Sequence, residues 1–221
     1  MTWCLFGPRP AEVLGTLAGL PGIAYVRGNT DRYVLTGEQP VPHSNAGDAA
    51  RDPRLVERMV AMAGAIGWTR GALVQSGVLD AITDLPTTIC AELPDGGRVL
   101  GVHASPGRDD GPGIASSPPD EVISSILGDC GADVVIGGHT DDPTDRIVGA
   151  VRALNPGSVG LSRQAGLARR MLVEADEEGV SVDLRRTPHD ANAVVNDLYD
   201  RGYPNAAYLE KALTGSLTFG S

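Results

Sequence analysis

Short apolar runs bounded by polar residues recur along the chain and predict the strands of an α/β protein. Residues 23–27, 98–104 and 133–136 are each rich in Val, Ile, Leu or Ala. Apolar runs of this length beside turn residues are typical of buried strands. Residues 149–154 form a fourth run of the same kind. We therefore predict a sheet assembled from segments that are distant in the sequence.

Two further patterns predict antiparallel hairpins, because each joins two strand-like runs through a short turn rich in Gly, Asp or Pro. The first turn is Pro94-Asp95-Gly96-Gly97, and the second is Asp176-Glu177-Glu178-Gly179. Around the second turn, apolar and polar residues alternate, which predicts one buried and one exposed face. The flanking strands span residues 87–93 and 98–104, and residues 169–175 and 180–186.

Apolar residues at helical spacing predict helices around these strands. One stripe runs from Val13 to Leu20 in a helix over residues 8–20, and Asp52-Pro53 is a typical start for a long helix. The polar segment from Asp31 through His43 to about Gly47 is predicted to be a loop. This order of elements favours a mixed sheet, or two packed sheets, with helices outside. Other predicted helices span residues 75–83, 118–127, 190–201 and 204–213.

Length and composition limit the class of protein. The 221 residues fit one domain, assigned to residues 1–213, with a flexible tail at 214–221. A net charge of −10 argues against general nucleic-acid binding, which requires clustered Lys and Arg. Three cysteines without a CxxC pair favour a reducing cytoplasm. No apolar run approaches about 18 residues, so no membrane span is expected, and the N-terminus lacks a signal-peptide pattern.

Potential metal ligands follow three of the predicted strands. Asn29 and Asp31 follow the first, His103 ends the second, and His139 and Asp141 follow the third. Ligands of α/β proteins gather beyond the carboxyl ends of strands. Imidazole with amide or carboxylate oxygen suits a divalent ion such as Mn, Fe, Ni, Co or Zn. We therefore predict one shared metal site.

Several of these residues also have an ordinary structural interpretation. A single histidine after a strand is more often hydrogen-bonded than metal-bound, and Asp141 is either a ligand or a solvated loop acid. Asp31 either orients a neighbour or caps the next segment. The turn after Asn155 either contacts phosphate through backbone amides or is simply tight. Three arginines are either phosphate-binding or surface charges: Arg27, Arg108 and Arg146.

Five motifs, in order along nearly the whole chain, resemble those of calcineurin-like metallophosphoesterases of the small bacterial and archaeal type. The resemblance implies a four-layer αββα sandwich of two mixed β-sheets, with two metal ions at the strand ends. The motifs are Gly7-Pro8-Arg9-Pro10-Ala11-Glu12-Val13-Leu14, Val26-Arg27-Gly28-Asn29-Thr30-Asp31, Val102-His103-Ala104-Ser105-Pro106, Gly137-Gly138-His139-Thr140-Asp141 and Leu154-Asn155-Pro156-Gly157-Ser158-Val159-Gly160.

The chain departs from that family pattern at four points. The first strand-helix-strand and its Asp-x-His motif are missing, and Thr2 stands where the metal-bridging Asp is expected. Thr30 replaces the His that would help protonate the leaving group, with Asp31 in support. Asp141 replaces the second His of Gly-His-x-His. By resemblance these losses remove one metal, so we expect at most one ion, held by Asn29, His103 and His139, with Asp141 as a further candidate ligand.

The expected function is metal-dependent hydrolysis of phosphomonoesters or phosphodiesters by metal-bound hydroxide, reduced or lost because one metal site is incomplete. The alternative is a non-catalytic scaffold of the same fold that binds a ligand or a partner. The expected ligand is a small phosphorylated molecule. A missing first strand leaves sheet edges unpaired, so self-association is also expected.

Overall fold

The computed structural model describes residues 6–40, 46–53, 55–162 and 164–216, which divide between two compact units. The sheet unit comprises Ala24–Gly28 and Pro86–His189. The helical unit comprises Thr2–Ile23, Asn29–Leu85 and Asp190–Ser221. The single domain over residues 1–213 stays a prediction. Thr2, His43 and tail residues 217–221 lie outside the described residues.

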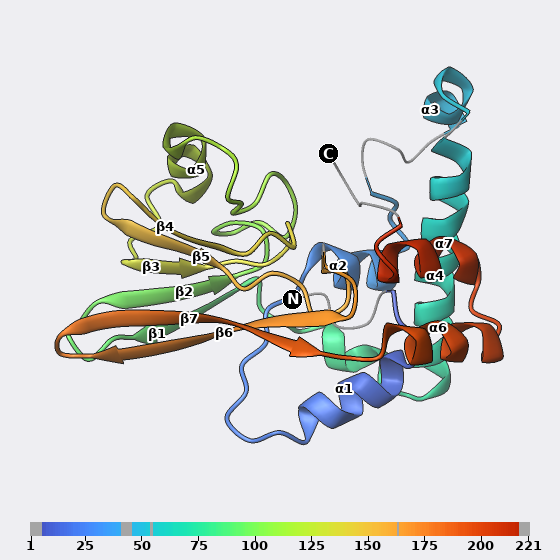
Figure 1. Ribbon diagram of the computed structural model, residues 1–221, viewed down its shortest axis with the longest axis horizontal. Coiled ribbons are helices and arrows are strands. Elements are labelled where there is room, and N and C mark those ends of the chain that lie inside the picture. The colour runs from blue at the N-terminus through green and yellow to red at the C-terminus, as the bar shows by residue number, and fades with distance from the viewer. Residues whose placement is uncertain (1–5, 41–45, 54, 163, 217–221) are drawn as a thin grey trace. The chain divides into compact units, whose positions relative to one another are not determined.

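A five-stranded mixed sheet, in the order β1-β2-β3-β5-β4, forms the centre of the sheet unit (Figure 1). The central strands β2 (Arg98–Val102), β3 (Val134–Ile136) and β5 (Val151–Asn155) are parallel. The edge strands β1 (Thr88–Glu92) and β4 (Thr144–Val148) pair antiparallel to their neighbours. Because β2, β3 and β5 run the same way, the residues that follow them meet at one edge of the sheet.

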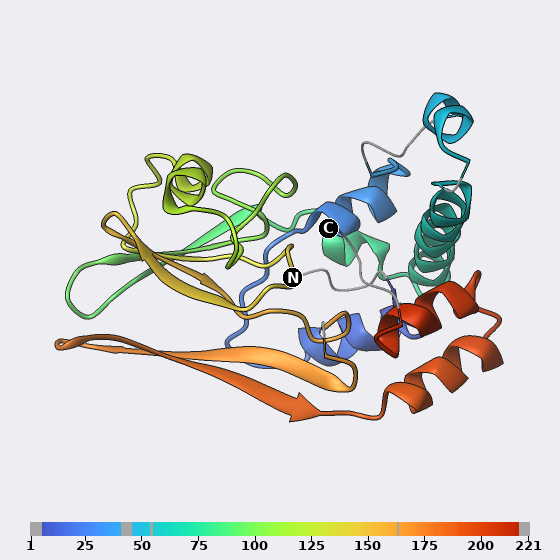
Figure 2. The same ribbon diagram turned by 45° about the horizontal axis from the view of Figure 1, so that its top comes forward.

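The two faces of this sheet are covered by different elements, since successive side chains of a strand point to opposite faces. Helix α5 (Asp120–Leu127) covers one face, and the antiparallel hairpin β6 (Leu167–Asp176)–β7 (Gly179–Pro188) covers the other (Figures 1 and 2). The helix side buries Leu100, Val102, Ile123, Leu127, Val135 and Ala153, and the hairpin side packs Met171, Val173 and Val182 against Val134 and Leu154.

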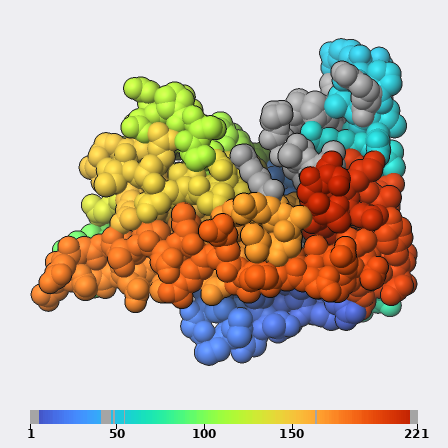
Figure 3. Space-filling view, in the orientation of Figure 1, coloured from blue at the N-terminus to red at the C-terminus, as the bar shows by residue number. Residues whose placement is uncertain are grey.

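The β6–β7 hairpin confirms the alternation read from the sequence. Val180 and Val182 pack against the sheet, whereas Ser181 and Asp183 between and beyond them are exposed. Its outer face forms part of the surface of the sheet unit (Figure 3). The predicted mixed α/β class with two packed sheets is therefore confirmed, and the second sheet among the described residues is this hairpin.

The helical unit is organised around its longest helix, α4. Residues Ala61, Ala65, Thr69 and Leu73, one turn apart, are buried along one face of it. None of the helices that the structure describes is long and apolar enough to cross a membrane. The helices of this unit are α1 (Pro10–Ala18), α2 (Asn29–Thr36), α3 (Ala46–Arg51), α4 (Leu55–Gln75), the 3₁₀-helix η1 (Leu79–Ile82), α6 (Ala191–Asp200) and α7 (Ala206–Leu213).

Several segments differ from the sequence-based expectation. The helix predicted over residues 75–83 is wrong, because α4 ends at Gln75 and only the short η1 follows, and strand β4 was not predicted. The predicted strand over residues 23–27 is wrong, because no strand forms there. Arg27 donates its amide to the carbonyl of Pro86 at 2.8 Å, but a proline has no amide to return, so a ladder does not continue. The predicted loop after Asp31 is also wrong in its first part, which continues helix α2 to Thr36. Burial of Tyr33 and Val34 stabilises that helix despite its polar composition.

Candidate metal centre of the sheet unit

His103 and His139 meet at the carboxyl edge of the sheet. His103 follows β2 directly, and His139 lies in the turn after β3. Nδ1 of His139 is 3.3 Å from Nε2 of His103, and the two rings pack edge to face with their centroids 5.1 Å apart. The parallel pairing of β2 with β3 explains this approach, because it places residues 36 positions apart in the sequence side by side.

The hydrogen-bond partners of the two rings indicate which nitrogen of each ring carries a proton. Nε2 of His139 lies 2.9 Å from the carbonyl oxygen of Gly111, which only accepts hydrogen bonds, so this nitrogen carries the proton. In the neutral ring Nδ1 then holds a lone pair, and Nε2–H of His103 donates to it. The lone pair of His139 Nδ1 therefore points at His103.

Both imidazoles are held neutral. Burial lowers the pKa of His103 to about 2, and the side chain is only 1% exposed. Burial also lowers the pKa of His139, although the hydrogen bond to Gly111 and the charges of Asp110 and Asp109 partly oppose that shift. The neutral ring is the form that binds metal ions.

Asn155, at the end of β5, fixes the turn that carries His139. Its side chain is fully buried, and Nδ2 donates to the carbonyls of Gly138 at 2.7 Å and Ile114 at 2.9 Å. Nδ2 also lies 2.9 Å from Oγ1 of Thr140, and Oδ1 accepts from the amide of Gly157 at 2.8 Å. The tight turn after Asn155 is therefore an observed structural feature, and Asn155 joins three separate segments around the histidines.

The turn after β3 is strained. His139 and Asp141 have φ angles of 66° and 55°, in the left-handed region that residues other than glycine rarely adopt. Gly113 packs so closely against this turn that a Cβ there would lie 2.8 Å from Cγ2 of Thr140. Strained residues of this kind concentrate at functional sites.

Among the other predicted site residues, Asn29, Thr30 and Asp31 follow Gly28 in the chain, and Asp141 lies two residues after His139. A Cβ on Gly28 would lie 2.9 Å from Cε1 of His103, so only glycine fits against that ring. Asn29 follows Gly28 in the chain and begins α2, where Thr30 and Asp31 are buried. Asp141 is half-buried. The assignments of Asn29, Thr30, Asp31 and Asp141 stay predictions.

The histidine pair fits a divalent ion as two of its ligands. Two nitrogens bound at about 2.05 Å to one tetrahedral ion lie about 3.3 Å apart, and the observed separation is 3.3 Å. Binding both would require His103 to move its proton to Nδ1. Within the described part of the chain, no group of three or more His, Cys, Asp or Glu side chains is arranged to hold a metal.

Three arginines considered as phosphate ligands have different environments. Arg146 donates to the carbonyl of Pro118 at 2.7 Å and pairs with Asp120, so it holds the loop before α5. Arg108 is 66% exposed and pairs with Asp110 at 3.5 Å. Arg27 pairs with the buried Asp109, with 3.9 Å between Nε and Oδ2. The sequence marked all three arginines but not Gly111 or Asp109, whose loop position carries no local signal.

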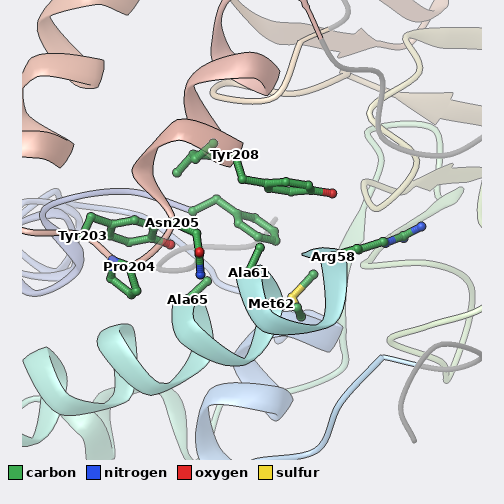
Figure 4. A pocket seen from close by; sticks show the side chains of 10 residues that line it. Arg58, Ala61, Met62, Ala65, Tyr203, Pro204, Asn205 and Tyr208 are labelled. Carbon is green, nitrogen blue, oxygen red and sulfur yellow. The ribbon is translucent and has the colours of Figure 1, made fainter. Parts of the chain in front are cut away.

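A separate apolar pocket lies in the helical unit, between α4 and the segment that leads into α7 (Figure 4). Ala61, Ala65, Tyr203 and Tyr208 line it, together with the aliphatic Met62. The ring of Tyr203 packs edge to face against Trp68 with a centroid distance of 5.7 Å. Such a lining supports helix packing rather than metal chemistry.

The fold is similar to that of a solved metallophosphoesterase. No protein-family model and no curated protein matches the sequence. Among solved structures, a metallophosphoesterase from Sphaerobacter thermophilus is similar over 96% of this chain and 84% of its own, with a TM-score of 0.63 and 19% identity. The hypothetical protein PH1004 from Pyrococcus horikoshii OT3 is similar over 99% of this chain and 84% of its own, with a TM-score of 0.75 and 18% identity. The resemblance read from the motifs is thus confirmed at the level of the fold.

Proposed function

We propose that the protein is a metal-dependent phosphoesterase, with activity reduced or lost relative to enzymes that hold two ions. The observation that carries this proposal is the buried pair of neutral imidazoles, 3.3 Å apart, at the carboxyl edge of the sheet. A metallophosphoesterase-like fold supports it. The substrate class is a small phosphomonoester or phosphodiester.

The residues that would hold the ion are His103, His139 and Asn29, with Asp141 as a further candidate. A bound divalent ion supplies positive charge to phosphoryl oxygens and acidifies a water molecule. The chain itself fixes the site: Gly111 and Asn155 orient the turn of His139, and Gly28 leaves room for the ring of His103. Thr30 offers a hydroxyl where a catalytic acid would stand, and a threonine hydroxyl is a poor proton donor near neutral pH, so slow leaving-group departure follows.

Metal binding is the first test. The full chain is titrated with Mn²⁺ or Zn²⁺ by isothermal calorimetry, and His103→Ala is compared with wild type. We expect the variant to lose about 100-fold or more in affinity, since one of few ligands is removed. His189→Ala is the matched control, because His189, which directly follows β7, is a histidine outside the proposed ligand set, and the variant should bind as wild type does. Equal binding by all three proteins would refute the metal centre.

Turnover is the second test. Hydrolysis of a chromogenic phosphodiester is followed with added Mn²⁺, in wild type and in His103→Ala. Slow turnover that disappears in the variant supports the proposal. Absence of turnover in a wild-type chain that binds the metal would favour the alternative, a non-catalytic scaffold that binds a ligand.

A further inference from the structure

The Arg27–Asp109 pair is a feature that the proposed function does not use. Nε of Arg27 is buried, and among the described residues it has no hydrogen-bond partner. The distance from this nitrogen to Oδ2 of Asp109 is 3.9 Å, beyond hydrogen-bond reach. A buried guanidinium nitrogen without a partner is costly, and each such group in a native protein calls for an explanation, of which a functional role is one.

Both members of the pair are close in sequence to residues that contact the histidines. Arg27 precedes Gly28, which packs against the ring of His103. Asp109 lies two residues before Gly111, whose carbonyl binds His139. The charge of Asp109 also acts on the pKa of His139. Both partners are thus tied to the histidine pair by short stretches of backbone.

The side chain of Arg27 is 29% exposed, whereas that of Asp109 is 10% exposed. Because Nε is buried, the exposed part of Arg27 lies elsewhere on the side chain. The recorded approach of Asp109 is to Nε, so the partly exposed remainder of the Arg27 side chain is where a second anion would have to bind. A guanidinium group can donate two parallel hydrogen bonds to two oxygens of one phosphate group.

The electrostatic balance also favours this role. The chain carries a net charge of −10, and Asp109 and Asp110 stand beside His139. A phosphoryl group approaching the histidines meets these carboxylates, which repel it. A cation at Arg27, beside Asp109, offsets part of that repulsion.

We propose that Arg27 binds the non-bridging oxygens of a phosphoryl group at this site and that Asp109 positions its guanidinium. The inference rests on the proposed phosphoesterase function for its substrate class, but it concerns binding alone. Arg27 is therefore a substrate-binding residue, and Asp109 is a positioning residue.

The test measures binding of inorganic phosphate to the full chain by equilibrium dialysis with labelled phosphate and Mn²⁺. Arg27→Ala should weaken binding by about tenfold or more, as expected for loss of a charge-assisted contact. Arg27→Lys should recover part of the affinity, because lysine keeps the positive charge but cannot donate the two parallel hydrogen bonds of a guanidinium. Arg108→Ala is the matched control: it removes an exposed arginine from the loop that contains Asp109, and it should change affinity by less than about twofold.

The role of Asp109 is tested in the same assay. Asp109→Asn should weaken phosphate binding less than Arg27→Ala does, and it should have no further effect on phosphate binding once Arg27 is already removed. The double variant Arg27→Ala/Asp109→Asn guards against misfolding, because it leaves no buried carboxylate without its cation. The double variant should lose phosphate binding and keep the near-UV circular dichroism of wild type.

The outcomes separate this inference from the proposed function. Phosphate affinity equal to wild type in Arg27→Ala or in the double variant overturns the inference, and so does a wild-type chain that binds no phosphate. Loss of phosphate binding on removal of Arg27, in a chain without turnover, keeps the inference and rejects hydrolysis. Turnover with an unchanged KM in Arg27→Ala keeps hydrolysis and rejects the inference.

Discussion

The two ends of the five-stranded sheet are built differently. At the amino end of the parallel strands, polar side chains are bonded at short distances: Asp133 accepts the amide of Arg98 at 2.8 Å, and Asp95 accepts the amide of Gly97 at 2.9 Å. At the carboxyl end, His103 and His139 face each other in a buried setting, and Arg27 has a buried nitrogen without a hydrogen bond among the described residues.

The amino end is nevertheless hollowed, by a groove lined by Asp95, Asp133 and Arg152 among others. Its carboxylates already accept backbone amides, and Arg152 already holds Asp145 and lowers the pKa of that carboxyl through their hydrogen bond. Because the polar groups that line this groove already have partners, we interpret the groove as a structural feature. Groups whose bonding is incomplete, on strained backbone, distinguish the carboxyl end as the functional one.

The largest predicted difference between the two ends is in acid sensitivity. Burial lowers the pKa of His103 from 6.5 to about 2, so between these values the unfolded chain binds more protons than the folded one. At pH values above the pKa of His103 in the unfolded chain, burial of the neutral ring makes its full contribution to the free energy of unfolding. It falls by about 1.4 kcal/mol per pH unit as the pH drops below that value, and His139 adds to the loss. Urea unfolding at about pH 7 and about pH 4.5 measures the difference.

In that experiment His103→Gln should show a shallower decline in the free energy of unfolding, because one of the two buried titrating rings is gone. Asp133→Asn, at the amino end, should keep the full decline attributable to the histidines. A slope that is the same in wild type and His103→Gln would show that His103 is not buried in its neutral form.

Asn155→Ala should lower the free energy of unfolding by about 3 kcal/mol, because it leaves buried carbonyl and hydroxyl partners unsatisfied. The turn of His139 should also lose its position, so Mn²⁺ affinity should fall by about tenfold or more, as for other residues that orient a ligand. Chemical denaturation and calorimetry provide the two readouts. Lost stability with unchanged metal affinity would separate Asn155 from the site.

Two glycines with positive φ give a matched comparison of the ends. Gly113→Ala should destabilise by about 2–3 kcal/mol, because strain at φ 66° is added to a clash with Thr140. Gly96→Ala, in the turn at the amino end, has φ 86° but open space around its Cβ, so it should cost about 1 kcal/mol. Thermal unfolding of both variants tests the order, and equal costs would remove the evidence for tight packing at Gly113.

The smallest effect is expected for Asp133→Ala. This exposed side chain accepts one backbone hydrogen bond, from Arg98, so its loss should cost about 1 kcal/mol of unfolding free energy. Phosphate and Mn²⁺ affinities should both stay within about twofold of wild type, since the change lies at the opposite end of the strands. A marked loss of either affinity would mean that the two ends are coupled.

The sequence by itself determined the strands on either side of Gly96-Gly97, the β6–β7 hairpin and helix α5, because their patterns are local and agree with their burial. It also marked His103 and His139, since each follows an apolar strand. Local pattern failed for residues 23–27, where the partner segment contains Pro86, and for α2, where tertiary burial outweighs a polar composition.

How the two imidazoles meet, and which groups surround them, depends on contacts between distant parts of the chain. The proton on His139 depends on Gly111, the turn depends on Asn155, and the guanidinium of Arg27 depends on Asp109. The two histidines and Asn155 are distant in sequence and come together through the parallel pairing of β2, β3 and β5. Hydrogen bonds, burial and charge act through space, so the chain order alone does not specify them.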